Sequence, residues 1–341
     1  MKYSASFEKF PLIFKKPAGT SRGFLLEKPS WLLKIKDNDQ NIEGIGECSI
    51  IPGLSIDDEA LIEEQLREVC NSINKTQSFD ELYPGLEKFP AIKFALETAI
   101  LDLKGGGKKI LFDNSFSRGE AGIMINGLVW MSGIEEMFWQ AKEKIEKGFK
   151  TIKFKIGAMD FESELNLIRR VRNEFGPDIE IRLDANGAFN NEEALSKLEQ
   201  LSAFQIHSIE QPIKPGHWQV MGKICATSPI PIALDEELIG ITGPAQKSEL
   251  LQEIKPQYII LKPSLLGGFK ESDEWINLIG NIPTEWWATS ALESNIGLNA
   301  IAQWTAEKKP HLPQGLGTGD LYMNNFPLPL KTIREKLWFL V

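Results

Sequence analysis

The sequence of 341 residues predicts a modified, TIM-like (β/α)8-type barrel of the α/β class with an N-terminal α+β capping domain. Two observations support this fold class. From residue 121 onward, strand-like and helix-like segments alternate as in parallel β/α units, and eight such strands over about 200 residues match a barrel. Before residue 121, short apolar runs precede two helix-like segments, which is typical of a small α+β unit. An open doubly wound sheet is the alternative, but its GxGxxG signal is missing.

The N-terminal part is expected to begin with strands and continue with helices. Apolar-rich runs that Pro, Gly, Asn and Asp interrupt predict strands within residues 12–16, 23–28, 30–37 and 44–55, the last of which ends in a Gly/Pro loop. Apolar residues at helical spacing then predict helices over residues 56–73 and 90–107. We therefore expect residues 1–120 to form the cap and residues from about 320 to 341 to complete it.

Residues 121–319 are expected to form the catalytic barrel. Its strand-like segments are, in order, IMINGLVW, TIKFKIG, IEIRLDAN, HSIEQP, PIALDEEL and YIILKPSLL, with weaker candidates EWWATSALES and LPQGLGTG for strands seven and eight. The intervening sequence predicts helices over residues 134–148, 162–176 and 191–203.

Charged residues recur once in each predicted β/α unit. The last charged residues of five successive strands are 29, 26, 25 and 27 residues apart, and they are Lys155, Asp184, Glu210, Asp235 and Lys262. Each would lie near the C-terminal end of its strand, which is the end that carries the active site of a barrel. Because side chains alternate along a strand, Lys153 shares the face of Lys155, and Asn186 shares that of Asp184. We expect this charged face to point into the barrel mouth.

Three carboxylates that converge in one site would repel one another unless a cation balances them. Asp184, Glu210 and Asp235 offer oxygen ligands, and such a set suits Mg²⁺, with Mn²⁺ as a possible substitute. Each residue alone has an ordinary explanation, because strand-end Asp residues often form turns or helix caps and edge strands often carry Lys. Five charges at the period of one β/α unit, with matching alternation, favour a functional site.

At these positions the sequence resembles the enolase superfamily, in its muconate-lactonizing-enzyme-like subgroup. The similarity covers nearly the whole chain and rests on KFK at 153–155, DAN at 184–186, EQP at 210–212, DEE at 235–237 and LKP at 261–263. The resemblance implies that Asp184, Glu210 and Asp235 bind Mg²⁺. It also implies that Lys155 and Lys262 form an acid/base pair on opposite faces of the substrate, since the superfamily uses Lys or His bases with Mg²⁺ and an enediolate.

Within the subgroup the sequence is most similar to the o-succinylbenzoate synthase family, at residues 46–55, 289–303 and 315–325. The resemblance implies a lyase of menaquinone biosynthesis that removes water from 2-succinyl-6-hydroxy-2,4-cyclohexadiene-1-carboxylate by syn elimination. The implied base, Lys155, would abstract the proton α to the carboxylate.

Further residues are candidates for binding this substrate. They are Lys153, which would face the reacting carboxylate, Asn186, Ser290 at strand seven as a donor to the succinyl carboxylate, and Arg22 in a cap loop. A turn Ser and a surface Arg are the alternative explanations of the last two.

Two other functions stay open. An N-acylamino acid racemase or dipeptide epimerase of the same superfamily would use the same two lysines, but the Asp-x-Asp expected of dipeptide epimerases near strand eight is missing from PQGLGTGD. A mandelate-racemase-like enzyme would need a His in strand seven, and residues 284–295 contain none. The other open function, after the synthase and the racemase or epimerase, is a non-enzymatic barrel that binds metal without catalysis. The presence of both lysines disfavours it.

The composition excludes several classes of binding partner and of catalytic chemistry. The net charge of −9 argues against nucleic acid and membrane surfaces, so a small-molecule carboxylate is the expected partner. Three Cys without a CxxC and three scattered His exclude a disulfide framework and HExxH zinc chemistry, so proton transfer is left to lysine. The sequence contains no signal-peptide-like start and no run of 18 uncharged apolar residues, so we expect a cytoplasmic protein without a membrane span.

Overall fold

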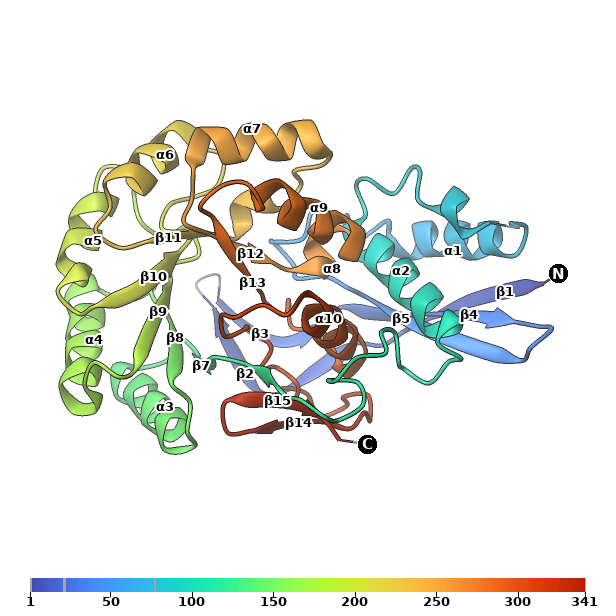
Figure 1. Cartoon of the computed structure of the whole chain (residues 1–341), viewed down its shortest axis with the longest axis horizontal. Coiled ribbons are helices and arrows are strands. Elements are labelled where there is room, and N and C mark those ends of the chain that lie inside the picture. Colours follow the sequence, from blue (N-terminus) through green and yellow to red (C-terminus); the bar gives the residue numbers. More distant parts are fainter. Residues whose placement is uncertain (1, 21–22, 77, 341) are drawn as a thin grey trace.

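A curved sheet of seven parallel strands organises the larger part of the computed structural model, which describes residues 2–20, 23–76 and 78–340 (Figure 1). The strands neighbour one another in chain order, as successive β/α units require, and this confirms the predicted fold class. They are β7 (Gly127–Val129), β8 (Thr151–Lys155), β9 (Glu180–Asp184), β10 (Ile206–Glu210), β11 (Ile232–Leu234), β12 (Tyr258–Leu261) and β13 (Glu285–Ala288).

The eighth predicted strand is reduced to two isolated bridges. Gln314 pairs with Ile125 ahead of β7, and Gly315 pairs with Thr289 behind β13, both in parallel. Pro313 cannot donate to a strand ladder, and the glycines have no side chains to pack on a sheet. A Cβ at Gly315 would lie 2.5 Å from Thr289 Oγ1, so the close approach needs a glycine. This segment fills the gap between the first and last strands.

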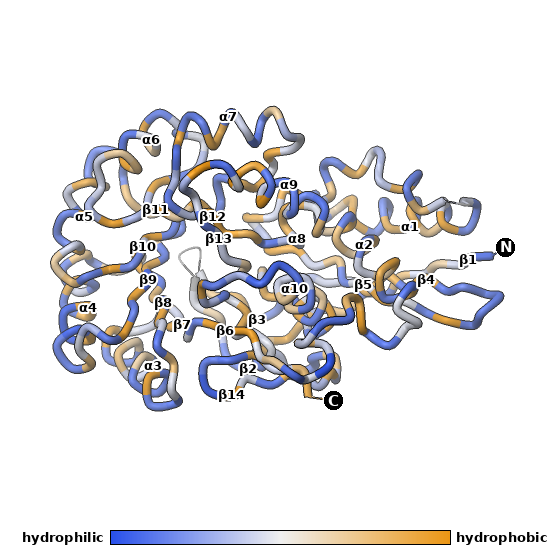
Figure 2. The backbone as a smooth tube through the Cα atoms, viewed as in Figure 1, coloured by the Kyte–Doolittle hydropathy of each residue, from blue (hydrophilic) through white to orange (hydrophobic). Residues whose placement is uncertain are grey.

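Helices cover the outer side of the curved sheet (Figure 1). Hydrophobic and hydrophilic residues alternate along the outermost helices (Figure 2), a pattern that gives a helix one apolar face for the core. The helices are α3 (Ile134–Glu146), α4 (Phe161–Phe175), α5 (Ala194–Ser202), α6 (Trp218–Thr227), α7 (Pro244–Ile254), α8 (Pro263–Leu266), α9 (Phe269–Ile279) and α10 (Asn295–Lys308), with the 3-10 turn η2 (Glu236–Leu238). The main core joins them to the fully buried Ile152 and Phe154 of β8, the apolar face that alternation predicted.

The N-terminal part packs helices on an antiparallel sheet of order β1-β4-β5. Its elements are β1 (Tyr3–Lys9), β2 (Leu12–Thr20), β3 (Gly23–Lys28), β4 (Ser30–Asp37), β5 (Ile42–Ser49), α1 (Ile62–Ile73), the 3-10 turn η1 (Phe79–Leu82) and α2 (Pro90–Lys104). Helix α2 lies very close to β5 because Gly46 has no side chain; a Cβ there would lie 1.9 Å from the carbonyl oxygen of Ala95. The β2–β3 hairpin extends from this sheet toward the barrel (Figure 1).

The helix predicted over residues 56–73 begins at Ile62, because the preceding residues turn toward α2. Asp57 accepts a hydrogen bond from the backbone N–H of Ala91, in the first turn of α2, at 3.0 Å. Such a side-chain bond offers the backbone an alternative to helix. The predicted strands of this part, in contrast, are all present.

The end of the chain contacts both parts. Leu321 and Met323 bond to the backbone of β2, at Lys15 and Ile13. Strands β14 (Leu330–Ile333) and β15 (Lys336–Phe339) then form a small antiparallel sheet with β6 (Ile123–Met124). The division of the chain near residues 120 and 320 stays a prediction.

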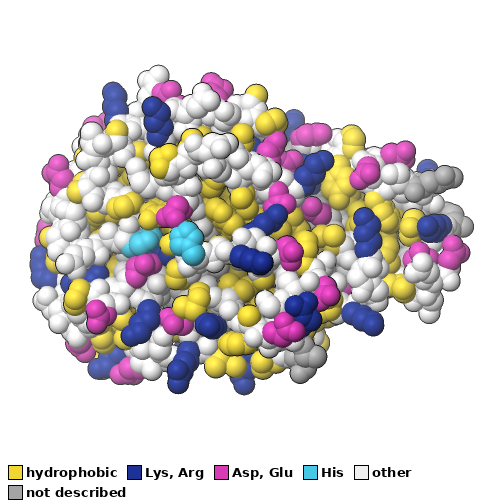
Figure 3. Space-filling model, viewed as in Figure 1, with side chains coloured by type: hydrophobic (Ala, Val, Ile, Leu, Met, Phe, Trp, Pro, Cys, Tyr) yellow, Lys and Arg dark blue, Asp and Glu magenta, His cyan; other side chains and the backbone are white. Residues whose placement is uncertain are grey.

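Charged side chains are scattered over the visible face and do not gather in one patch (Figure 3). Among the described helices, none combines the length and the apolar character needed to cross a bilayer.

Candidate active site

The C-terminal ends of five neighbouring strands bring the predicted charged residues together. Strand register pairs Lys155 with Asp184 and Asp184 with Glu210, so these three lie in one row across β8, β9 and β10. Asp235 follows β11 directly, and Lys262 follows β12. The three carboxylates are nearly inaccessible, with at most 2% of each residue exposed. Their burial requires positive charge close by.

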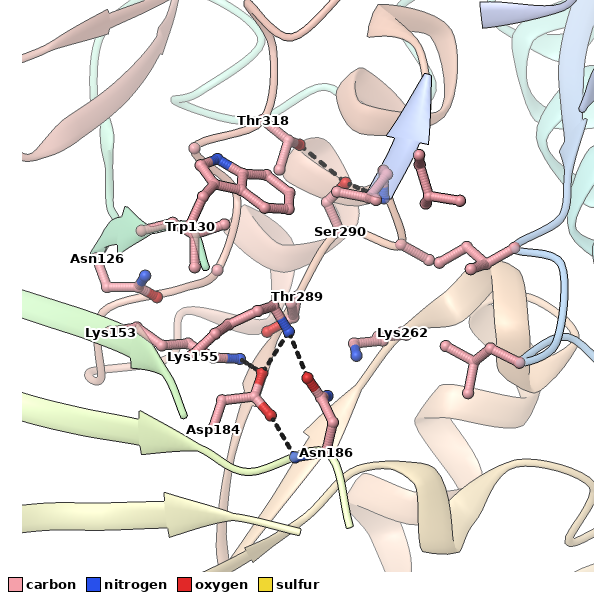
Figure 4. Close-up of a pocket in the computed structure, with 18 of the residues that line it drawn as sticks. Asn126, Trp130, Lys153, Lys155, Asp184, Asn186, Lys262, Thr289, Ser290 and Thr318 are labelled. Atoms are coloured by element: carbon pink, nitrogen blue, oxygen red, sulfur yellow. Dashed lines mark hydrogen bonds and ion pairs between the residues drawn. The ribbon is translucent and has the colours of Figure 1, made fainter. Parts of the chain in front are cut away.

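Two lysines of β8 supply part of that charge. Lys153 Nζ lies 2.9 Å from Asp184 Oδ2 and also donates to Glu210 Oε2. Lys155 Nζ lies 2.9 Å from the same Asp184 oxygen and donates to Asn186 Oδ1 at 2.8 Å (Figure 4). Both lysines therefore converge on one carboxylate, as the shared face of β8 predicted.

Lys262, which follows β12, is the third lysine near these carboxylates. It donates to Asp235 Oδ2 and its Nζ lies 4.0 Å from Glu210 Oε1. Burial lowers the pKa of Lys262, but the charges of Asp235 and Glu210 outweigh it and raise this pKa above its usual value. Burial, reinforced by the charge of Asp184, raises the pKa of Glu210 well above its ordinary value. For Asp184, nearby ammonium groups led by Lys153 outweigh burial and hold its pKa below the usual range.

The carboxylates also fit a hard divalent cation. Glu210 Oε1 is buried and has no hydrogen-bond partner among the described residues, although buried polar atoms are normally satisfied. All three candidate ligands supply oxygen, which Mg²⁺ prefers. Within the described chain, no three acidic, His or Cys side chains form a ready metal cage. Lysine ammonium groups instead contact the oxygens that a cation would bind.

A cavity of about 150 Å³ opens beside these charges, between the cap loops and the barrel. Lys155 and Lys262 reach toward its centre from opposite sides (Figure 4). Its remaining lining includes Phe24, Leu25, Ile51, Pro52 and Leu54 of the cap, and Asn126, Leu128, Trp130, Thr289, Ser290, Ala291, Leu292, Gly315, Gly317 and Thr318 of the barrel. The cavity thus combines an apolar wall with a few charged groups, as ligand pockets commonly do.

The predicted substrate-binding residues have internal partners. The Asn186 amide accepts from Lys155 and donates to Glu236 Oε1 at 2.9 Å, so it holds the Lys155 side chain in place. The Ser290 hydroxyl lines the cavity and donates to Glu293 Oε2 at 2.5 Å. Arg22 lies outside the described residues.

Sequence reasoning missed three polar residues of the cavity, Asn126, Thr289 and Thr318. Asn126 and Thr289 each carry a side-chain oxygen, Oδ1 and Oγ1, that is buried without a hydrogen-bond partner among the described residues. Asn126 could have been found as the polar residue inside the apolar run IMINGLVW, and Thr289 as the residue that ends EWWAT. Thr318 and the cap residues give no such signal, because they reach the cavity from loops.

Comparisons with known proteins show which family and which solved structures the chain resembles. The family model described as enolase C-terminal domain-like matches residues 136–326. An o-succinylbenzoate synthase of Desulfotalea psychrophila is 45% identical over 352 aligned residues, which cover 94% of this chain and 95% of that protein. The crystal structure of MenC from the same organism superposes with a TM-score of 0.89 at 40% identity, covering 99% of this chain and 100% of the other.

A more distant structure shows the fold alone. The dipeptide epimerase of Enterococcus faecalis, crystallised with Mg and the dipeptide L-Leu-L-Tyr, has a TM-score of 0.86 at 20% identity, covering 99% of this chain and 97% of that one.

Proposed function

The chain belongs to the enolase superfamily, and we propose that it acts as an o-succinylbenzoate synthase. This lyase would remove water from 2-succinyl-6-hydroxy-2,4-cyclohexadiene-1-carboxylate. The observation that carries the proposal is the meeting of three lysines and three buried carboxylates beside one cavity, which the three lysines and Asp184 line. The 45% identity to a protein of that activity, over nearly all of both chains, supports the choice of reaction. A role in menaquinone biosynthesis and a cytoplasmic location are part of the proposal, and the three free, buried cysteines suit a reducing compartment.

Asp184, Glu210 and Asp235 would hold Mg²⁺, or Mn²⁺ in its place. The unsatisfied Glu210 Oε1 and the all-oxygen donor set support this assignment. When bound, the cation would supply Lewis-acid stabilisation of the negative charge that develops on the substrate carboxylate.

Lys155 would serve first as the base and then as the acid. It reaches into the cavity from β8, and its bond to Asn186 at 2.8 Å fixes the position of its Nζ atom. In its neutral form it would take the proton α to the carboxylate, which leaves an enediolate. The resulting ammonium group would return that proton to the departing hydroxyl on the same face. The two steps together release one water molecule and give an aromatic ring.

Lys153 and Lys262 would supply fixed positive charge. Lys153 is buried beside Asp184 and Glu210, where it could bind a substrate carboxylate oxygen. Lys262 faces Lys155 across the cavity (Figure 4). From there it would stabilise the anionic intermediate, partly through a cation–π contact with the substrate ring.

The alternative is an N-acylamino acid racemase or dipeptide epimerase, because lysines on opposite sides could also exchange a proton on two faces of a carbon. To test this, the protein is incubated in D2O with Mg²⁺ and the cyclohexadiene substrate. Separate incubations contain N-acylamino acids or dipeptides instead. The proposed function predicts an absorbing aromatic product from the first substrate. Deuterium at the α-carbon of an amino acid derivative, without any aromatic product, would establish the alternative instead.

A further inference from the structure

A buried hydrogen-bond network lies behind one wall of the cavity, formed by residues 290–292 and called the 290–292 wall below. Its centre is the fully buried Glu293, whose Oε2 accepts the Ser290 hydroxyl proton at 2.5 Å. Because a carboxylate only accepts, the Ser290 proton is committed to Glu293. The Thr318 hydroxyl, 2.8 Å from Ser290 Oγ, then donates to Ser290. In this arrangement neither hydroxyl has a proton left to donate to a substrate.

The backbone of the 290–292 wall depends on the same serine. Leu292 lines the cavity with a φ of 62°, a left-handed conformation that leucine rarely adopts. Its N–H donates to Ser290 Oγ at 3.0 Å, and its carbonyl oxygen accepts from the Tyr322 hydroxyl at 2.5 Å. A strained residue persists where its surroundings hold it, and here it faces the cavity. The Ser290 and Tyr322 hydroxyls therefore hold the two backbone polar groups of this strained residue.

The network continues into the cap through Glu47 of β5, which is fully buried. Glu47 accepts from the backbone N–H of Ser294 at 2.8 Å and of Gly297 at 3.0 Å, at the start of α10. A Cβ at Gly297 would lie 2.6 Å from Glu293 Cβ and 3.0 Å from Glu47 Oε2, so both acidic side chains meet there. Lys28 of β3 is also fully buried and interacts electrostatically with both carboxylates. The cap thus provides the charge that lets Glu293 stay buried.

We propose that Glu293 is a positioning residue for substrate binding. It orients the Ser290 hydroxyl, that hydroxyl holds Leu292 in its left-handed conformation, and the resulting wall shapes one side of the substrate cavity. Ser290 and Thr318 lie across the cavity from Asp184 and Asn186, away from the reacting end (Figure 4). The wall therefore determines how tightly the substrate binds and has little effect on the chemical step. The kinetic part of this inference rests on the proposed function.

The variant Glu293→Met tests this role because it keeps the side-chain length and removes both acceptor oxygens. The KM for the cyclohexadiene substrate should rise roughly tenfold, while kcat should change by less than about threefold. Ser264→Ala is the matched control, since Ser264 donates to the other oxygen of Glu293 and does not bond to Ser290. Its KM and kcat should match those of the wild type. An unchanged KM in Glu293→Met would overturn the proposal, because it would show that Glu293 does not shape substrate binding. A lower KM would overturn it as well, because the freed Ser290 proton would then serve the substrate directly.

A second readout does not need turnover. In crystal structures without substrate, Leu292 should leave the left-handed region in Glu293→Met and keep it in Ser264→Ala. Ser290→Ala leaves the charge of Glu293 in place, and in this variant too Leu292 should leave the left-handed region. It replaces Glu293→Met in the test if the methionine variant does not fold. If Leu292 stayed left-handed in both Glu293→Met and Ser290→Ala, the positioning role of Glu293 would be refuted. Absence of o-succinylbenzoate formation by the wild type would refute the proposed function and leave this structural result standing.

Discussion

Asp57 should make the stability of the protein depend on pH. It follows the cap loop that carries Leu54 into the cavity, and only 6% of it is exposed. Asp57 Oδ1 accepts from the Ala91 backbone N–H at 3.0 Å, whereas Oδ2 is buried without a hydrogen-bond partner among the described residues. Burial, offset in part by the bond from Ala91, raises the pKa of this carboxyl from 3.8 to about 7.

The size and sign of the effect follow from this shift. Below about pH 4 the carboxyl is protonated in both the folded and the unfolded protein, so its contribution to stability is fully present. Between about pH 4 and 7 only the unfolded chain ionises, and each pH unit lowers the free energy of unfolding by about 1.4 kcal/mol. Above about pH 7 the loss is complete and amounts to about 4 kcal/mol.

The variant Asp57→Asn isolates this contribution, because Asn keeps an acceptor for the Ala91 N–H and does not ionise. Urea unfolding at about pH 5 and about pH 8 should show the difference between variant and wild type moving by about 3 kcal/mol in favour of the variant. Glu97, whose pKa burial also raises to about 7, titrates in both proteins and cancels in the difference. If the free energies of unfolding of the two proteins changed with pH in parallel, Asp57 would not be the carboxyl that makes the stability depend on pH.

Two further substitutions test the site and the packing. Lys155→Ala and Lys262→Ala should each lower kcat by about 10³-fold, measured by product absorbance, with Mg²⁺ binding retained in calorimetry; activity preserved in both variants would exclude the proposed proton transfer. Gly46→Ala should lower the free energy of unfolding by about 1–3 kcal/mol, since its Cβ would lie 1.9 Å from the Ala95 carbonyl oxygen. Gly133→Ala, with no atom within 4 Å of the added Cβ, is the control, and equal stability changes in the two alanine variants would contradict the packing argument.

The barrel could be predicted from the sequence because each strand carries its own evidence. In TIKFKIG the alternation of apolar and charged residues places Lys153 and Lys155 on one face, and the structure shows both ammonium groups on Asp184. The repeat of one charged residue per β/α unit then fixes which strand ends share the site. These signals are local in the chain, so a single sequence is sufficient to read them.

Other features depend on contacts between distant segments and could not be predicted. The eighth predicted strand meets β13 where Gly315 fits against Thr289, a contact that local sequence does not encode. The late start of α1 depends on Asp57 reaching Ala91 in another helix. The burial of Glu293 similarly depends on the charge of Lys28 in the cap, more than 200 residues earlier in the chain. In the run TSALES the sequence pointed to Ser290, which lines the cavity, but gave no sign of the role of the buried Glu293 behind it.

The most direct test of the proposed function is an assay of o-succinylbenzoate formation by the purified protein, with and without EDTA. With Mg²⁺ present, the protein should convert the cyclohexadiene carboxylate to the aromatic product. EDTA should abolish this turnover, and added Mg²⁺ or Mn²⁺ should restore it. Failure to form o-succinylbenzoate in the presence of Mg²⁺, or formation at an undiminished rate in EDTA, would contradict the assignment of Asp184, Glu210 and Asp235 with the three lysines as a metal-assisted dehydratase site.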